Sequence, residues 1–325
     1  MSDLDADLRR WVEAGILDPQ VAERIRAFEA ARGAPAPARP SAERPGVIEV
    51  LLYLGIAVLA VGVFALAAQN WGDLASPARV AVTAVPAAFT LLLGALLRDR
   101  PEPGMRRAGQ LAWAAAVGLS ALALGVYIWE YEPFGLARDE DATPFLVVTA
   151  AATGLALLLW AITPSTLQLL ALGVSLFFLA QAIGQWPDEF SSSLAGGTLA
   201  AAALAAIALT ETDRLVPRAA ARTIFGLLLA VGAYQPGFSS GGTPWEIPAF
   251  LAAAGLLALG VWRSSFQYVL WGVLLLFVAL VRAIFQNFSD QLGAPVALII
   301  SGVLLIGAVL LLARLAPQLR RGVAA

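Results

Sequence analysis

The sequence predicts an all-α, polytopic integral membrane protein of about ten transmembrane helices arranged as helical hairpins, with a small cytoplasmic N-terminal helical hairpin. The 325 residues are 59% hydrophobic and only 14% charged, whereas an ordinary soluble domain carries roughly 25% charged residues. Apolar stretches of about 20 residues recur from Val47 onward, and each can cross a bilayer as a helix. The alternating stretches of about 10 residues typical of a membrane β-barrel are absent from the sequence, so each span must bond its backbone amides within a helix.

Residues 1–33 are not membrane-like and predict the cytoplasmic helical hairpin. Gly15 ends a first helix, and Asp18 with Pro19 begins a second one, because Asp caps helices and Pro is tolerated at the first helical position. So short a segment cannot bury a core of its own. We therefore expect its apolar stripe to dock on the membrane domain, on another copy of the chain or on a protein partner. The stripe consists of Leu4, Leu8, Trp11, Val21, Ile25 and Phe28.

The remaining chain divides into a linker, a membrane domain and a tail. Residues 34–46 contain four prolines and predict a semi-rigid extended linker. A transmembrane domain is expected over residues 47–315, followed by a cytoplasmic tail over 316–325. The expected spans lie near residues 47–68, 77–97, 108–129, 144–162, 166–185, 193–210, 219–235, 245–262, 266–286 and 294–313.

The distribution of arginine predicts the orientation. With the N-terminus inside, the outer segments hold only Arg79, Arg138 and Arg282, and every other arginine falls on an inner segment. Because cytoplasmic loops carry the excess of basic residues, both termini are expected in the cytoplasm, with the protein in a bacterial inner (plasma) membrane.

A recurring amide-rich ending follows four of the spans that run outward: "AAQNWG" at 67–72, "AIGQWP" at 182–187, "GAYQPG" at 232–237 and "AIFQNF" at 283–288. One interpretation is a boundary, because amides, Gly and Pro terminate helices and Trp favours the headgroup layer. The alternative is an outward-facing polar vestibule. Its residues would be Gln69, Asn70, Gln181, Gln185, Gln235, Arg282, Gln286 and Asn287.

Arg282 allows two hypotheses of its own. It lies about one turn below the outer end of its span, so it can extend outward and pair with one of the outer acidic residues. An intramembrane charge is also a candidate for substrate binding.

The residue types that are missing limit the chemistry. The chain contains no cysteine and no histidine, and all 21 basic residues are arginine. Thiolate chemistry, imidazole ligation and lysine Schiff bases are therefore excluded. We expect no catalytic, cofactor-binding or metal-binding residues, no cofactor and no nucleic-acid partner. The expected partners are membrane lipids and a protein partner, or a second copy, bound through residues 1–46.

Two stretches and one following residue carry a family resemblance. They are "LRRWVEAGILDPQVAERIRAFEA" at 8–30, "EVLLYLGIAVLAVGVFALAAQNW" at 49–71, and Arg79 after a short loop. In this region, roughly residues 4–97, the chain resembles a bacterial family of predicted membrane proteins catalogued as domain of unknown function 2157. The resemblance implies a cytoplasmic hairpin joined to a polytopic domain, and it implies no residue roles.

Three functions remain open. The favoured hypothesis is a non-catalytic interaction or assembly subunit of a membrane complex, since no charged side chain is expected deep in the bilayer. The alternative is a small-molecule transporter that uses the polar vestibule. A third hypothesis is an integral-membrane enzyme that uses the outer carboxylates of Asp73, Glu130 and Glu132.

Overall fold

The structure, a computed structural model, describes residues 8, 10–32, 65, 68–133, 142–186, 189–238, 246–283, 299, 302–303 and 307. The chain divides into two compact units, Met1–Leu66 and Ala67–Ala325. All regular elements in the described part of the chain are helical. The all-α class predicted from the sequence is thus confirmed over these residues.

The first unit contains α2 (Pro19–Arg32), preceded by a helical segment at residues 10–13. Gly15 has a left-handed φ of 71°, which a glycine adopts without steric cost, and its N–H donates to Val12 O at 3.0 Å. The Asp18 Oδ1 atom accepts a hydrogen bond from Gln20 N at 2.8 Å at the start of α2. Local turn chemistry therefore sets where this helix begins.

The second unit is a succession of helices joined by short connections. They are η1 (Trp71–Asp73), α4 (Ser76–Leu97), α5 (Pro103–Tyr131), α6 (Thr143–Ile162), α7 (Thr166–Gly184), α8 (Ser192–Glu211), α9 (Arg218–Tyr234), η3 (Gln235–Phe238), α10 (Glu246–Trp262) and a helix over Phe266–Ala283. A proline lies at one of the first two positions of α4, α5 and α6. The Ser165 and Ser191 hydroxyls cap α7 and α8 by accepting from Gln168 N and Leu194 N.

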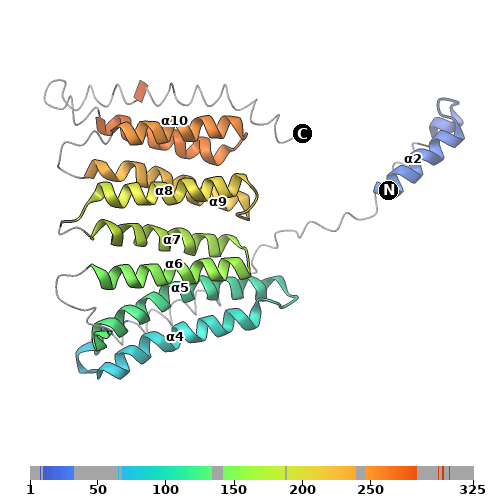
Figure 1. Cartoon of the computed structure of the whole chain (residues 1–325). Helices are drawn as coiled ribbons and strands as arrows, with labels where there is room; N and C mark the ends of the chain where they lie inside the picture. The colour runs from blue at the N-terminus through green and yellow to red at the C-terminus, as the bar shows by residue number, and fades with distance from the viewer. Residues whose placement is uncertain are drawn as a thin grey trace. The chain divides into compact units, whose positions relative to one another are not determined.

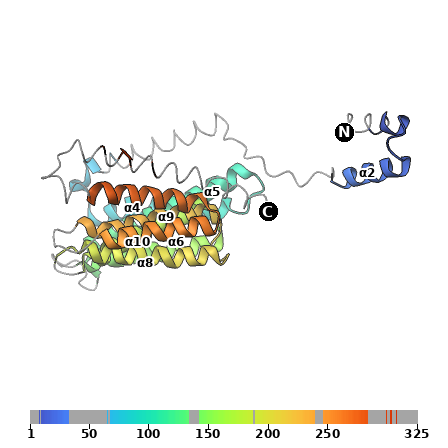
Figure 2. The same cartoon turned by 90° about the horizontal axis from the view of Figure 1, so that it is seen from above.

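Neighbouring helices of the chain pack against each other in order, from α4 to α10 (Figure 1). The helix α7 also contacts α5 and α9, so it lies at the centre of the described bundle. In the apolar part of α7, 44% of the residues are buried inside the bundle, whereas in the apolar part of α4 only 17% are buried. An apolar core runs from α5 to the helix Phe266–Ala283 and includes Trp113, Leu199, Phe225 and Tyr268. A second, smaller cluster joins α9, α10 and Phe266–Ala283 through small residues such as Ala253. Figure 2 shows the same helices from a second direction.

Close contacts at small residues hold the hairpins together. A Cβ on Gly94 of α4 would lie 2.1 Å from Trp113 Cδ1 of α5. The Trp113 indole N–H donates to Leu91 O at 3.0 Å. Between α8 and α9, a Cβ on Gly196 would lie 2.5 Å from Gly232 O. These glycines let the helix backbones approach as they do in membrane bundles.

Because neighbouring helices run in opposite directions, the bundle has two ends. The Glu211 end is where α4, α6, α8 and α10 terminate, and the Glu130 end is the opposite one. Among the described residues of this unit, the Glu130 end carries Arg79 and Arg282. The arginines at the Glu211 end are Arg98, Arg100, Arg106, Arg107, Arg214, Arg218, Arg222 and Arg263. The bundle is therefore asymmetric in basic charge.

The outer surface of the bundle is apolar along the helices. On α4, Val85, Phe89, Leu92 and Leu96 form one face and are each about 60% exposed. A water-soluble bundle would place polar residues on such a face. In the described part of the chain, six helices are long and apolar enough to cross a membrane: α4, α5, α6, α7, α8 and Phe266–Ala283. The molecule is a multi-pass helical membrane protein.

The number of spans stays a prediction. The expected seventh and eighth spans correspond to α9 and α10, which have 17 residues each. The expected spans at 47–68 and 294–313 lie almost entirely outside the described residues.

Candidate functional site

The predicted vestibule residues lie at or near helix ends at the Glu130 end. Gln69 and Asn70 are exposed just before η1. Gln185 and Gln235 are the residues that follow α7 and α9, and their N–H groups donate back to carbonyls of the last helical turn. Gln286 and Asn287 lie outside the described residues. The described amides therefore occupy positions where helices stop.

Arg282 makes its described contacts with the end of α9. Its Nη1 donates to the Tyr234 hydroxyl at 3.2 Å, and its Nη2 donates to Gly237 O. The guanidinium carbon lies 5.2 Å from the centre of the Tyr234 ring, which adds a cation–π contact. Arg282 thus ties the helix Phe266–Ala283 to α9 and η3.

Two of the predicted amides are only partly satisfied. Gln181 Nε2 and Gln235 Oε1 are buried and have no hydrogen-bond partner in the described part of the chain. Gln181 lies in α7, and Gln235 directly follows α9, a helix that contacts α7. Buried polar atoms are normally bonded to protein or to ordered water. These two atoms therefore provide a donor and an acceptor for a water or a small polar molecule.

A second cluster joins η1, α4 and α5 at the same end. Arg79 Nη1 lies 2.8 Å from Glu130 Oε1, and the Glu130 side chain is only 7% exposed. Arg79 Nε donates to Trp71 O at 3.0 Å, and its Nη2 donates to Gly72 O at 3.3 Å. The guanidinium also lies 5.9 Å from the Trp71 ring centre. Glu130, considered above as a catalytic carboxylate, is here held in an ion pair with Arg79.

A large apolar groove begins beside this cluster. The cavity, of about 770 Å³, is lined by α5, α6 and α7, with Trp71 and Glu130 at one end; we call it the α5–α7 groove. Thr149 and Ser175 also line it, but their hydroxyls donate to carbonyls of their own helices, Phe145 O and Leu172 O. A ligand in the groove would therefore meet apolar walls, and it would find polar groups only at the Glu130 end.

A smaller cavity of about 530 Å³ lies between α8, α9 and α10 and is lined by Gly, Ala, Leu, Ile and Pro residues. Among the vestibule residues that the structure describes, none lines either of these two cavities. In the described part of the chain, no group of three or more acidic side chains lies close enough together to hold a metal ion.

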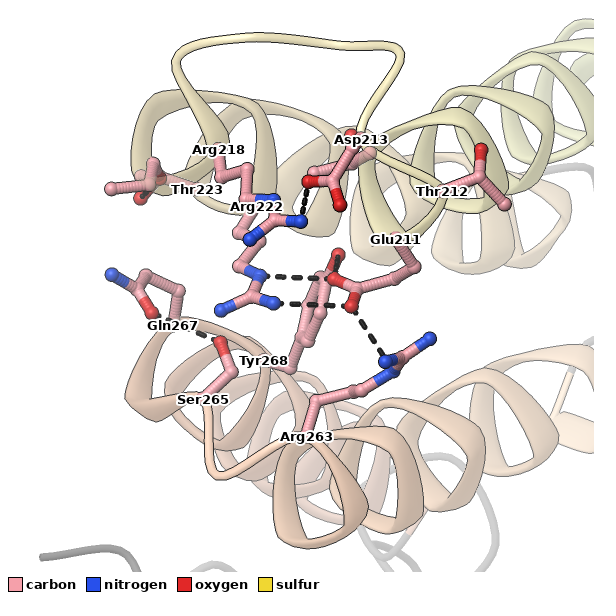
Figure 3. A network of polar contacts seen from close by, with 12 residues as sticks. Glu211, Thr212, Asp213, Arg218, Arg222, Thr223, Arg263, Ser265, Gln267 and Tyr268 are labelled. Atoms are coloured by element: carbon pink, nitrogen blue, oxygen red, sulfur yellow. Dashed lines mark hydrogen bonds and ion pairs between the residues drawn. The ribbon is translucent and has the colours of Figure 1, made fainter. Parts of the chain in front are cut away.

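An extensive polar network lies at the other end, around Glu211 (Figure 3). Arg222 binds the carboxylate with two nitrogens, Nε to Oε1 at 2.9 Å and Nη2 to Oε2 at 3.0 Å. Arg263 Nε lies 3.1 Å from Oε2, and the Tyr268 hydroxyl donates to Oε1 at 3.0 Å. The network joins the end of α8 to α9, to the turn after α10 and to the next helix. The carboxylate is saturated, so it acts as a structural clamp.

This clamp was not predicted from the sequence. Arg222 and Arg263 served only to orient the chain, and Glu211 and Tyr268 carried no prediction. The available signal was weak: all four residues fall near span ends on the same predicted side. Which span ends meet depends on how the helices pack. A helix that is apolar on all faces gives no sequence signal of which face packs against which neighbour.

The residues of the N-terminal docking stripe differ in exposure. Leu8 is buried, whereas Trp11 and Val21 are 37% and 40% exposed. Ile25 is half-buried. Leu4 and the Phe28 side chain lie outside the described residues. Ile16, absent from the predicted stripe, is 73% exposed.

Comparison with known proteins bears on the first half of the chain. Residues 9–161 match the family described as "Predicted membrane protein (DUF2157)". The resemblance to this family is confirmed. No curated protein and no solved structure matches the chain. The part that matches DUF2157 contains Trp71, Arg79 and Glu130, while the Glu211 clamp and Arg282 lie beyond it.

Proposed function

We propose that the protein is a non-catalytic interaction or assembly subunit of a complex in the bacterial inner membrane, with both termini in the cytoplasm. The observation that carries this proposal is that the charged side chains near the helix ends are engaged in contacts within the bundle. Glu211 is saturated by internal partners, Glu130 is paired with Arg79, and Arg282 binds the end of α9. Groups held in this way stabilise a bundle and are not poised for chemistry.

The N-terminal unit supports a docking role. Trp11, Ile16 and Val21 expose large apolar side chains on two short helical segments and the turn between them. Aromatic residues of this kind are frequent anchors of protein interfaces. A protein partner or a second copy of the chain would cover them, through residues 1–46.

The cytoplasmic assignment of the termini is supported by the charge asymmetry. The Glu211 end carries most of the described arginines of the bundle. The positive-inside rule assigns such an end to the cytoplasm.

The test is affinity purification of the full chain from native membranes in mild detergent, with mass spectrometry and total-mass measurement. We expect a stoichiometric protein partner, or a dimer, that is lost in a Trp11→Asp, Val21→Asp double variant and on deletion of residues 1–46. A Glu13→Gln variant, changed at an exposed polar position of the same segment, is the matched control and should retain it. A wild-type protein that elutes as a single chain without a partner would refute the proposal.

A second candidate is a small-molecule transporter. The buried Gln181 Nε2 and Gln235 Oε1 atoms, which have no hydrogen-bond partner among the described residues, favour it. A panel of small polar solutes would be screened for uptake into proteoliposomes. Transport predicts that Gln181→Leu abolishes uptake of one solute while the thermal stability is kept, because Leu needs no hydrogen-bond partner. No uptake of any solute by the wild type would remove this candidate.

A further inference from the structure

We propose that the α5–α7 groove binds an acyl chain of a zwitterionic glycerophospholipid whose headgroup lies on the Arg79–Glu130 pair. The inference does not depend on the assembly role proposed above. It rests on three features of the groove: its lateral opening, its length and the charges at its end.

The groove opens sideways, where the surrounding bilayer supplies the neighbours. Leu122, Trp129 and Leu170 line it and are also 46%, 74% and 50% exposed. Val174 and Phe178, from α7, are lining residues that are 49% and 47% exposed. In a protein whose apolar helix faces contact lipid, hydrocarbon chains have direct access to such a groove.

The length of the groove suits an extended acyl chain. On α5 the lining runs from Ala114 to Glu130, which at 1.5 Å per residue is roughly 24 Å. A single leaflet accounts for about half of the ~30 Å hydrocarbon thickness. A chain that enters beside Glu130 therefore stays within the groove. The volume of about 770 Å³ also lies within the usual range of ligand pockets, roughly 300–1,000 Å³.

The charges at the groove's end select the headgroup. Glu130 lines the groove and Arg79 holds it at 2.8 Å, so one negative and one positive group stand side by side. A guanidinium has five N–H donors, and the contacts of Arg79 described above use one donor on each nitrogen. The other donors can bind a phosphate oxygen, while Glu130 attracts an ammonium group. A headgroup that carries a phosphate but no ammonium group would lack the attraction to Glu130.

Two glycines allow a matched pair of variants. A Cβ on Gly118, which lines the groove, would meet nothing within 4 Å, and the same holds for Gly154 of α6, which does not line it. Gly118→Leu should therefore fill the groove without disturbing the helix contacts. Gly154→Leu makes the same chemical change on a surface away from the groove.

The experiment uses full-length protein, stripped of lipid and reconstituted into vesicles that contain a phosphatidylethanolamine with a photoactivatable acyl chain. We expect labelling of α5, α6 and α7 that Gly118→Leu lowers by about tenfold, equivalent to about 1.4 kcal/mol of binding. Gly154→Leu should label like the wild type, and both variants should keep the wild-type thermal stability. A phosphatidylglycerol with the same acyl chain should label the groove several-fold less, and Glu130→Gln should reduce that difference.

Several results would overturn the proposal. Equal labelling of the wild type and Gly118→Leu would exclude the groove as the binding site. Equal labelling by the two lipids would exclude selection by the ion pair. Crosslinking of the groove to a protein in place of lipid, in native membranes, would identify a different occupant.

Discussion

Glu211 illustrates how this protein holds a charge at the end of a span. Its carboxylate receives two nitrogens of Arg222, one of Arg263 and the hydroxyl of the fully buried Tyr268. Two carboxylate oxygens offer about four acceptor positions, so these contacts use its capacity. One acidic side chain therefore links three helices and a turn.

We expect Glu211→Gln to destabilise the bundle by about 2 kcal/mol, because two arginines then lose their common counter-charge in a largely buried position. Arg263→Gln is the comparison. The Arg263 side chain is 38% exposed and contributes one nitrogen, so its loss should cost no more than about 1 kcal/mol. Thermal unfolding in detergent, followed by circular dichroism, measures both. If Glu211→Gln and Arg263→Gln both lowered the stability by the same small amount, the clamp would not be structural.

At the scale of the helices, the hairpin α4–α5 is held together by a close fit between a glycine and a tryptophan ring. Gly94 faces the Trp113 ring, and the indole N–H reaches back to Leu91 O. The helix α4 has few other buried residues, namely Thr83 and Ala87 besides Gly94. Its attachment to the bundle therefore depends on this contact.

Gly94→Ala should lower the stability by about 1–3 kcal/mol, the usual cost of overpacking, because the new methyl group collides with the Trp113 ring. Gly154→Ala is the control, since its Cβ meets nothing within 4 Å. It should be neutral or slightly stabilising, as Ala favours helices over Gly. Unfolding midpoints in the same detergent compare the two. A Gly94→Ala protein as stable as Gly154→Ala would contradict the proposed packing.

How far the sequence predicts the structure differs between elements and contacts. Helix ends were predictable from local chemistry: the span expected at 166–185 ends as a helix at Gly184, and the one expected at 219–235 ends at Tyr234. The partners of Arg282 and Glu211 were not predictable. Spans that are apolar all round give no signal of which face meets which neighbour, so side-chain pairs between spans emerge only from the packed structure.

For the whole molecule, the two ends differ in charge. The chain has no cysteine, so single cysteines introduced at exposed positions report on each end without background. We chose Asp99 at the Glu211 end and Glu189 at the Glu130 end, both of which are exposed.

In intact cells, a membrane-impermeant maleimide should label Glu189→Cys, while Asp99→Cys should react only after permeabilisation, because the arginine-rich end faces the cytoplasm. The labelled fraction is measured by the mass shift on gels. The opposite pattern would reverse the proposed orientation of the termini.

The order in which helices pack has a consequence for synthesis. From α4 to α10, each helix meets its predecessor in the chain, so most contacts can form as soon as a hairpin leaves the ribosome, as expected for a fold rich in local contacts. Glu211 is an exception. Its partner Arg222 is made shortly afterwards, but Arg263 and Tyr268 emerge only after α10. Until then a nascent chain holds this carboxylate with a single arginine, and the helix Phe266–Ala283 locks the earlier ones in place when it is translated.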